Sequence, residues 1–142
     1  MIAIVSRPIA PHEREAVIAF LKREGYSRTV AERDRFFISE HGGEIFGVVR
    51  LSRQDGALVL RGMRVRSDVQ RQGVGTQLLY RVVLSALAEA CYCIPYRWLI
   101  PFYAQAGFRE VTATEVPEFL ASRHLKYTND GLDVVMMCRP AD

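Results

Sequence analysis

The 142-residue sequence contains few cysteines, few histidines and almost no lysine. Three cysteines, Cys91, Cys93 and Cys138, are too few for a disulfide framework, and this favours a reducing, cytoplasmic setting. The three histidines are scattered and do not show the spacing of metal ligands, so no metal is predicted. No apolar run approaches the roughly 20 residues that span a bilayer, and neither a signal peptide nor a membrane partner is expected.

The positive charge of the chain is mild and comes almost entirely from arginine. The formal net charge is +3, and Lys22 and Lys126 are the only lysines. The most basic stretch, RGMRVRSDVQR, has no aromatic residues between its arginines, so no nucleic-acid partner is expected. A hydrophobic content of 49% and a charged content of 25% are typical of a globular protein. The length fits one domain over residues 1–142.

The hydrophobic pattern predicts strands that alternate with helices, which indicates an α/β (α+β) fold. An HGG turn between two apolar runs predicts a hairpin, and a helix after residue 73 shows one apolar stripe as far as Ala90. The predicted strands cover residues 2–7, 36–40, 44–52, 57–65, 91–94, 108–112 and 132–139. The predicted helices cover residues 11–24, 74–90, 98–106 and 116–124.

The loop at residues 70–76 has the composition of an anion site. It joins a predicted strand to a predicted helix, so backbone N–H groups and the positive end of a helix dipole meet at one point. Gly73 and Gly75 allow a ligand to approach the backbone closely, and Arg71 adds a positive charge. The same glycines would also suit a plain tight turn with solvated arginines, and the spacing alone leaves both interpretations open.

Two common nucleotide motifs do not fit this loop. A P-loop requires a lysine after its second conserved glycine, and Gly75 is followed by Thr76. A dinucleotide fingerprint requires a third glycine, and Leu78 occupies that position.

Two blocks of the sequence together resemble the GNAT superfamily of acyl-CoA-dependent N-acetyltransferases. Gln70 to Gly75 resembles the family's coenzyme loop, Gln/Arg-x-x-Gly-x-Gly/Ala, and the block from Tyr103 to Phe108 resembles its Tyr-x-x-x-Gly-Phe pattern. Their order, their separation of about thirty residues and the strand-loop-helix context make the combination specific. The resemblance covers nearly the whole chain and implies a single GNAT-like domain with a central mixed sheet of about six to seven strands flanked by helices.

The resemblance implies that acetyl-CoA is the co-substrate. Backbone N–H groups from Arg71 to Thr76 would bind its pyrophosphate, and the strand at Met63 to Val65 would bind the pantetheine arm as an added strand does. The implied coenzyme-binding residues are Met63, Arg64, Val65, Gln70, Arg71, Gln72, Gly73, Val74, Gly75 and Thr76.

The resemblance also implies a catalytic role for Tyr103. A tyrosine at this position often protonates the departing thiolate, and a phenol with a reference pKa of about 10 can donate at neutral pH. The alternative is that Tyr103 is a packing residue of a short apolar helix. The family often has an asparagine where this chain has Tyr96, and it often has a glutamate on the strand that reads LVLRGMRV here. The general base is therefore unassigned, and the candidates, each of which also suits a solvated surface role, are His41, Glu44, Glu115, Glu118 and His124.

We therefore expect an N-acetyltransferase that moves an acetyl group to a primary amine of a small molecule, by direct attack on the thioester with Tyr103 as general acid. The alternatives are a peptide or protein N-acetyltransferase and a non-catalytic, regulatory CoA-binding module. A homodimer is left open. Residues 112–130 are expected to form part of the acceptor pocket, because variable loops carry specificity.

Overall fold

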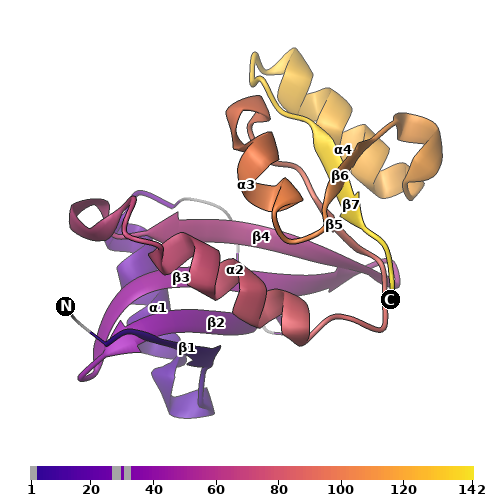
Figure 1. Cartoon of the computed structure of the whole chain (residues 1–142). Coiled ribbons are helices and arrows are strands. Elements are labelled where there is room, and N and C mark those ends of the chain that lie inside the picture. The colour runs from indigo at the N-terminus through magenta and orange to yellow at the C-terminus, as the bar shows by residue number, and fades with distance from the viewer. Residues whose placement is uncertain (1–2, 27–29, 31–32) are drawn as a thin grey trace. The chain divides into compact units, whose positions relative to one another are not determined.

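The computed structural model describes residues 3–26, 30 and 33–142 (Figure 1). Four α-helices and four short 3₁₀ helices alternate with seven strands within these residues. The strands are β1 (Val5–Pro8), β2 (Arg35–His41), β3 (Glu44–Gln54), β4 (Ala57–Val65), β5 (Cys91–Cys93), β6 (Arg109–Val111) and β7 (Met136–Arg139). The α-helices are α1 (Arg14–Arg23), α2 (Val74–Leu84), α3 (Ile100–Ala104) and α4 (Glu118–Asn129). The 3₁₀ helices are η1 (Pro11–Glu13), η2 (Ser67–Val69), η3 (Arg97–Leu99) and η4 (Ala113–Glu115).

The strands form a seven-stranded mixed sheet in the order β1-β2-β3-β4-β5-β7-β6. β1, β2 and β3 pair antiparallel, as do β5, β7 and β6, while β4 and β5 pair in parallel at Leu58↔Cys91 and Val59↔Tyr92. Pro8 is tolerated in β1 because this strand lies at the edge of the sheet, where a missing N–H donor breaks no ladder. The predicted mixed sheet with flanking helices is confirmed.

Residues of the chain group into two compact units, which are described separately. The first unit comprises Met1–Ser52 and Leu60–Ser85, and the second comprises Arg53–Val59 and Ala86–Asp142. The sheet runs through both units, since β3 and β4 each contribute residues to both of them.

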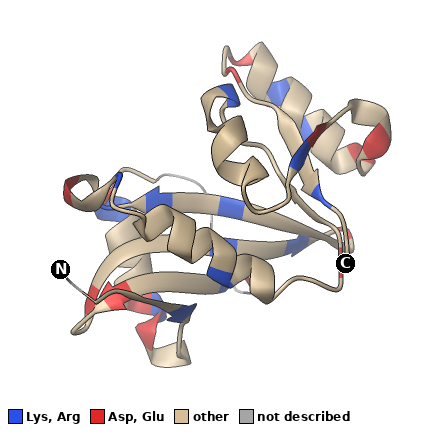
Figure 2. Ribbon diagram, viewed as in Figure 1, with Lys and Arg blue, Asp and Glu red and all other residues tan. Residues whose placement is uncertain are grey.

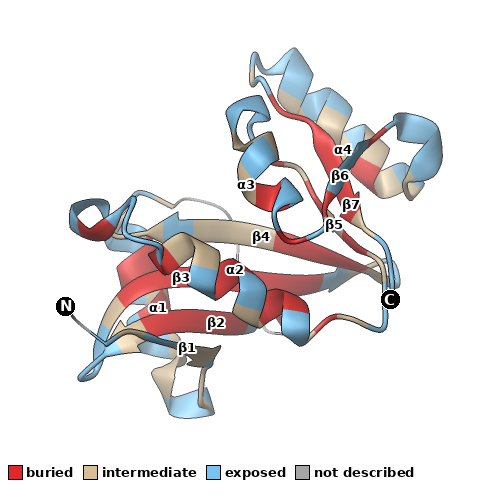
Figure 3. Cartoon of the chain, in the orientation of Figure 1, coloured by how far each residue is buried: buried red, intermediate tan, exposed pale blue. Residues whose placement is uncertain are grey.

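Helices α1 and α2 cover opposite faces of the first unit's strands (Figure 1). Val17 and Phe20 of α1 pack with Phe36 and Ile38 of β2, so these alternate β2 residues face α1. Phe37, between them, points the other way and has the guanidinium of Arg81, from α2, 5.8 Å from its ring centroid. Burial follows this layering in Figure 3: β2 and β3 are mostly red, and α1 and α2 are each buried along the stripe that faces them.

A buried ion pair lies inside the first unit. The Arg50 side chain is 1% exposed and the Asp34 side chain is 3% exposed, and Arg50 Nη1 donates to the Asp34 carboxylate. Ser52 Oγ donates to the same carboxylate, and Arg50 Nη2 donates to the hydroxyl oxygen of Tyr26 at 2.6 Å. Because each buried charge is paired and hydrogen-bonded, removing one partner would leave the other charge uncompensated.

The second unit contains β5, β7 and β6, the start of β4, and helices α3 and α4. One of its core clusters joins Val111 of β6 to Met136 and Cys138 of β7, with Tyr92 packed against them. α4 contributes the fully buried Leu120. All three cysteines are buried and free, and burial raises the pKa of the Cys93 thiol well above its usual value.

Several predicted boundaries were wrong, and the largest error concerns α2. Its apolar stripe continues in the sequence to Ala90, but the helix ends at Leu84, where the N–H of Ser85 turns back to the carbonyl of Val82 at 3.1 Å. The next residues take tertiary partners instead. Leu87 O accepts from the N–H of Asp142 at 2.9 Å, and the Glu89 carboxylate forms a bidentate pair with Arg53.

The other corrections are smaller. The helix predicted at 116–124 runs over Glu118–Asn129, and the strand predicted at 132–139 is regular only over Met136–Arg139. The segments predicted as helices at 11–24 and 98–106 each begin as a 3₁₀ turn and continue as a shorter α-helix. Ile2, predicted to begin the first strand, lies outside the described residues.

Candidate functional site

The backbone reverses sharply between β4 and α2. After η2 the chain passes through Arg71 with φ +66° and Gly73 with φ +85°, both in the left-handed region. Gly73 is the N-cap of α2, and a Cβ built on it would meet no atom within 4 Å. A glycine is preferred there for its backbone angles, because L-residues adopt this conformation only at a cost.

The N-terminus of α2 carries no side-chain cap. Among the described residues, the N–H groups of Gly73, Val74 and Gly75 have no hydrogen-bond acceptor, whereas Gln77 N–H donates to Gly73 O at 3.0 Å. These three donors lie at the positive end of the helix dipole, where an anion is stabilised. The structure thus places the predicted loop residues at an uncapped helix start.

The glutamines of the loop bond to its own backbone. Gln70 Nε2 donates to Val65 O at 3.0 Å, and Gln72 Nε2 reaches Asp68 O at 3.5 Å. Both side chains therefore stabilise the turn that precedes Gly73. Thr76 lies one residue beyond Gly75, in the first turn of α2.

The end of β4 supplies the other predicted coenzyme-binding residues. Val65 packs against the cluster that contains Phe46 and Val74, which ties this strand end to the start of α2. Arg64 is exposed, and its guanidinium lies 5.1 Å from the centroid of the Tyr26 ring. Met63 O accepts a hydrogen bond from Arg64 Nη1 at 3.1 Å. Figure 2 shows basic residues recurring along β4.

Arg66, which sequence reasoning did not single out, joins two segments of the first unit. Its Nε lies 2.6 Å from Asp68 Oδ1, and its Nη1 bonds to the Glu44 carboxylate. These bonds raise the pKa of Arg66, and the bond to Arg66 lowers the pKa of Asp68. Its only sequence signal is an acid two residues along the chain, because Glu44 lies 22 residues away.

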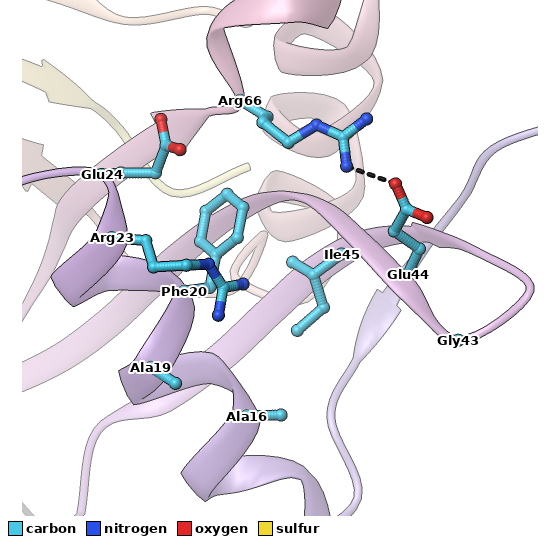
Figure 4. Close-up of a pocket in the computed structure, with 9 residues that line it drawn as sticks. All are labelled: Ala16, Ala19, Phe20, Arg23, Glu24, Gly43, Glu44, Ile45 and Arg66. Carbon is cyan, nitrogen blue, oxygen red and sulfur yellow. Dashed lines mark hydrogen bonds and ion pairs between the residues drawn. The ribbon is translucent and has the colours of Figure 1, made fainter.

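A groove of about 340 Å³ opens beside Arg66 in the first unit (Figure 4). Phe20 and Ile45 contribute apolar surface to it, and its charged lining residues are Arg23, Glu24, Glu44 and Arg66. Figure 4 shows the Arg66–Glu44 bond on one side of the groove and the side chains of α1 on the other. The two positive and two negative charges of the lining cancel, so the lining does not favour a ligand of either charge.

Tyr103 lies in α3 of the second unit and is 6% exposed. Its ring makes edge-to-face contacts with Phe102, at 5.0 Å between centroids, and with Phe108, at 5.8 Å. Its carbonyl accepts from the N–H groups of Ala106 at 3.1 Å and Phe108 at 3.3 Å, which close the turn through Gly107. The ring therefore has a packing function, and this packing fixes the direction of its hydroxyl.

The histidines named as candidate bases each use one ring nitrogen. His41 Nδ1 lies 2.7 Å from Ala3 O, and His124 Nε2 lies 2.9 Å from Val134 O. A carbonyl only accepts, so these nitrogens carry the hydrogens, and the opposite ring nitrogens are the basic ones when the rings are neutral.

The acids named as candidate bases differ in their hydrogen bonds and ion pairs. Glu115 accepts from the N–H of Thr112 at 3.0 Å and pairs with Arg109 at 3.4 Å, and these bonds lower the pKa of its carboxyl. A lowered pKa makes Glu115 a weaker base. Glu44 is bonded to Arg66, and Glu118 is exposed in the first turn of α4.

Tyr96, at the position where the family often has asparagine, belongs to an exposed aromatic pair. Its ring stacks on Trp98 with centroids 4.4 Å apart and planes 6° apart. No group of three or more His, Cys, Asp or Glu side chains that could hold a metal ion is found among the described residues. None of the helices described is both long enough and apolar enough to cross a membrane.

A mixed sheet flanked by helices, with a glycine-containing turn before an uncapped helix start, places the protein in the α+β class. The model of the acetyltransferase (GNAT) domain matches residues 32–110, which is more than half of the chain. The protein belongs to this family.

Solved structures with the same fold span different acceptors. An N-acetylglutamate synthase from Neisseria gonorrhoeae, complexed with coenzyme A and N-acetyl-glutamate, matches with a TM-score of 0.69 and 20% identity over 100% of this chain and 36% of that one. The present chain thus spans about a third of that synthase chain. A GNAT-family acetyltransferase from Staphylococcus aureus Mu50 matches with a TM-score of 0.68 and 19% identity over 99% and 100% of the two chains. The ribosomal-protein-S18-alanine N-acetyltransferase of Escherichia coli matches with a TM-score of 0.70 and 16% identity over 99% and 95%.

Proposed function

We propose that this protein is an acetyl-CoA-dependent N-acetyltransferase that acetylates a primary amine of a small molecule. The observation that carries the proposal is the uncapped start of α2, where the N–H groups of Gly73, Val74 and Gly75 have no acceptor within the described residues. Such a group of donors suits the pyrophosphate of acetyl-CoA, and Arg71 adds positive charge. Family membership and the coenzyme A complex of the N. gonorrhoeae synthase support this choice of anion.

The proposed reaction is a direct attack of the neutral amine on the thioester carbonyl. The new C–N bond forms as the C–S bond breaks, the amine gives up a proton to a base or water, and the coenzyme leaves as a thiol. Tyr103 donates the proton that converts the thiolate to the thiol. The packing of its ring against Phe102 and Phe108 supports this role, because a fixed ring holds the hydroxyl in one direction.

A protein acceptor is the second candidate. The E. coli neighbour is named for an alanine of a ribosomal protein, so a protein acceptor is compatible with this fold. We favour a small amine in a cytoplasmic setting, with neither nucleic acid nor membrane as partner and no metal. A homodimer stays open.

The deciding experiment measures thiol release from acetyl-CoA against a panel of amines, polyamines, amino acids and peptides, together with thermal stabilisation by CoA alone. Turnover with one small amine class is the expected result. Turnover with peptides only would favour the protein acceptor. Stabilisation by CoA without turnover on any amine would favour a regulatory CoA-binding module, and the absence of both would refute the proposal.

A further inference from the structure

Arg66 fixes the backbone where β4 ends and the coenzyme loop begins. Its N–H donates to Phe46 O at 2.8 Å, and its carbonyl accepts from Val69 N–H at 3.0 Å. It is also the N-cap of η2, the 3₁₀ turn that leads into the loop. Both the strand before this point and the turn after it are therefore held by main-chain hydrogen bonds of one residue.

The Arg66 side chain adds a second set of bonds across the same junction. Nε and Nη2 donate to the two oxygens of Asp68, at 2.6 Å and 2.9 Å, which makes a bidentate pair inside the loop. Nη1 donates to Glu44, at the start of β3 (Figure 4), and the guanidinium lies 4.3 Å from the centroid of the Phe46 ring. One planar group thus links the loop to the β2–β3 hairpin through three donors and an aromatic face.

The charges of this cluster would oppose the binding of an anion. Arg66 contributes one positive charge, whereas Asp68 and Glu44 contribute two negative charges, so the cluster carries a net negative charge close in sequence to the loop proposed to bind pyrophosphate. Attraction for phosphate does not explain why two carboxylates are placed there. A geometric role explains their position, because both carboxylates accept hydrogen bonds from the same guanidinium and hold it in place.

We propose that Arg66 is a positioning residue for the coenzyme loop: through Asp68 and Glu44 it holds residues 67–73 in the conformation that presents the N–H groups at the start of α2. The inference rests on the proposed function, since it assigns the loop to CoA. Arg66 does not touch the coenzyme in this scheme.

The test compares the direction in which each of three substitutions changes the dissociation constant of CoA. Arg66→Ala, Asp68→Asn and Glu44→Gln should all weaken CoA binding, and Asp68→Asn should do so by up to about fivefold, because solvent screens this exposed pair. Simple electrostatics predicts the opposite sign for Asp68→Asn and Glu44→Gln, because each removes a negative charge near the phosphates. Tighter CoA binding in these two variants would overturn the positioning role.

A matched control is available in the second unit. Arg53 and Glu89 form a bidentate surface pair of the same kind, with bonds of 2.8 Å and 2.7 Å, and the hydrogen bonds found among the described residues do not connect this pair to the loop. Arg53→Ala and Glu89→Gln should leave CoA affinity unchanged. An equal loss of affinity in these controls would show a general charge or stability effect and would refute the inference.

An independent readout does not need CoA. In the ligand-free protein, the amide protons of Val69 and Gln77, bonded to Arg66 O and Gly73 O, should exchange with solvent faster in Asp68→Asn than in the wild type. Unchanged exchange at both amides would contradict the positioning role even if the protein bound no CoA, whereas faster exchange without CoA binding would refute only the proposed function.

Discussion

Arg71 and Gly73, two residues apart, both adopt left-handed backbone angles immediately before α2, at φ +66° and φ +85°. The pair turns the chain into α2. The helix then begins with three N–H groups that have no hydrogen-bond acceptor among the described residues. Only one of the two positions is a glycine, so the loop stores strain at Arg71. Asp55, in the turn between β3 and β4, is the other non-glycine residue with a positive φ among the described residues, so the angle alone does not mark a functional turn.

The first prediction tests the close approach at Gly73. Gly73→Ala should lower CoA affinity by about tenfold or more, because the added methyl group occupies the space that the phosphate needs and strains the N-cap. Gly131→Ala is the matched control, since Gly131 has φ +89° and also has open space around its Cβ position. Both variants should lose a similar amount of stability, about 1–2 kcal/mol. Equal CoA affinity in the two variants, measured by calorimetry, would count against the site.

The second prediction separates charge from strain at Arg71. Arg71→Gly relieves an unfavourable φ, so its melting temperature should match or exceed that of the wild type. Its CoA affinity should fall, and the loss should shrink between about 0.01 M and about 1 M salt as screening increases. Arg71→Lys keeps the charge and should retain most of the affinity. A loss that does not depend on salt would show that Arg71 acts through something other than charge.

The third prediction concerns the Tyr103 hydroxyl. Tyr103→Phe keeps both edge-to-face ring contacts and should lower kcat by about 100-fold with little change in KM for acetyl-CoA, as expected for general acid catalysis. Phe108→Leu perturbs the same aromatic group without removing a hydroxyl. It should lower the melting temperature more than Tyr103→Phe does and reduce kcat far less. If both variants reduce kcat equally, Tyr103 acts by packing alone.

The fourth prediction is a stability change with pH. Arg7 and the N–H of Ala10 bond to Glu13 and lower the pKa of its carboxyl to about 2 from 4.5. A lowered folded-state pKa means that the contribution to stability is complete above pH 4.5 and is lost as the pH falls toward 2. Solvent screens the pair, whose side chains are 35% and 21% exposed, so about 1 kcal/mol is expected.

Glu13→Gln should therefore be less stable than the wild type at neutral pH and equally stable near pH 2. Glu15→Gln, at an exposed acid in the first turn of α1, is the control and should not change the shape of the profile. Denaturant unfolding between pH 2 and pH 7 measures the difference. A constant gap between wild type and Glu13→Gln across this range would contradict the assignment.

The elements that could be predicted were those whose bounds depend on neighbouring residues in the sequence. β4 matches its predicted range because a Gly-containing turn and a glycine-rich loop bound it on both sides. The end of α2 could not be predicted, because the apolar stripe continues to Ala90 while contacts of Leu87 and Glu89, with residues far along the chain, decide the structure there. Gly131 was the missed stop signal for α4, which ends two residues before it.

The proposed site divides in the same way. The loop at residues 70–76 consists of consecutive residues, so its glycines and Arg71 could be named from the sequence, and their role in coenzyme binding stays a prediction. Arg66 was not, because its importance depends on Glu44, which the β2–β3 hairpin brings beside it. The buried pair of Arg50 and Asp34 escaped for the same reason, since the two residues are 16 positions apart and belong to no motif.

The most direct test of the account follows the backbone amides of the loop by nuclear magnetic resonance during a titration with CoA. The amide signals of Gly73, Val74 and Gly75 should shift strongly with CoA, because the pyrophosphate becomes their acceptor. Pantetheine, which lacks the phosphates, should leave these three signals nearly unchanged. Saturable CoA binding that does not perturb the three amides, or no CoA binding at all, would contradict the central claim that the start of α2 is the coenzyme site.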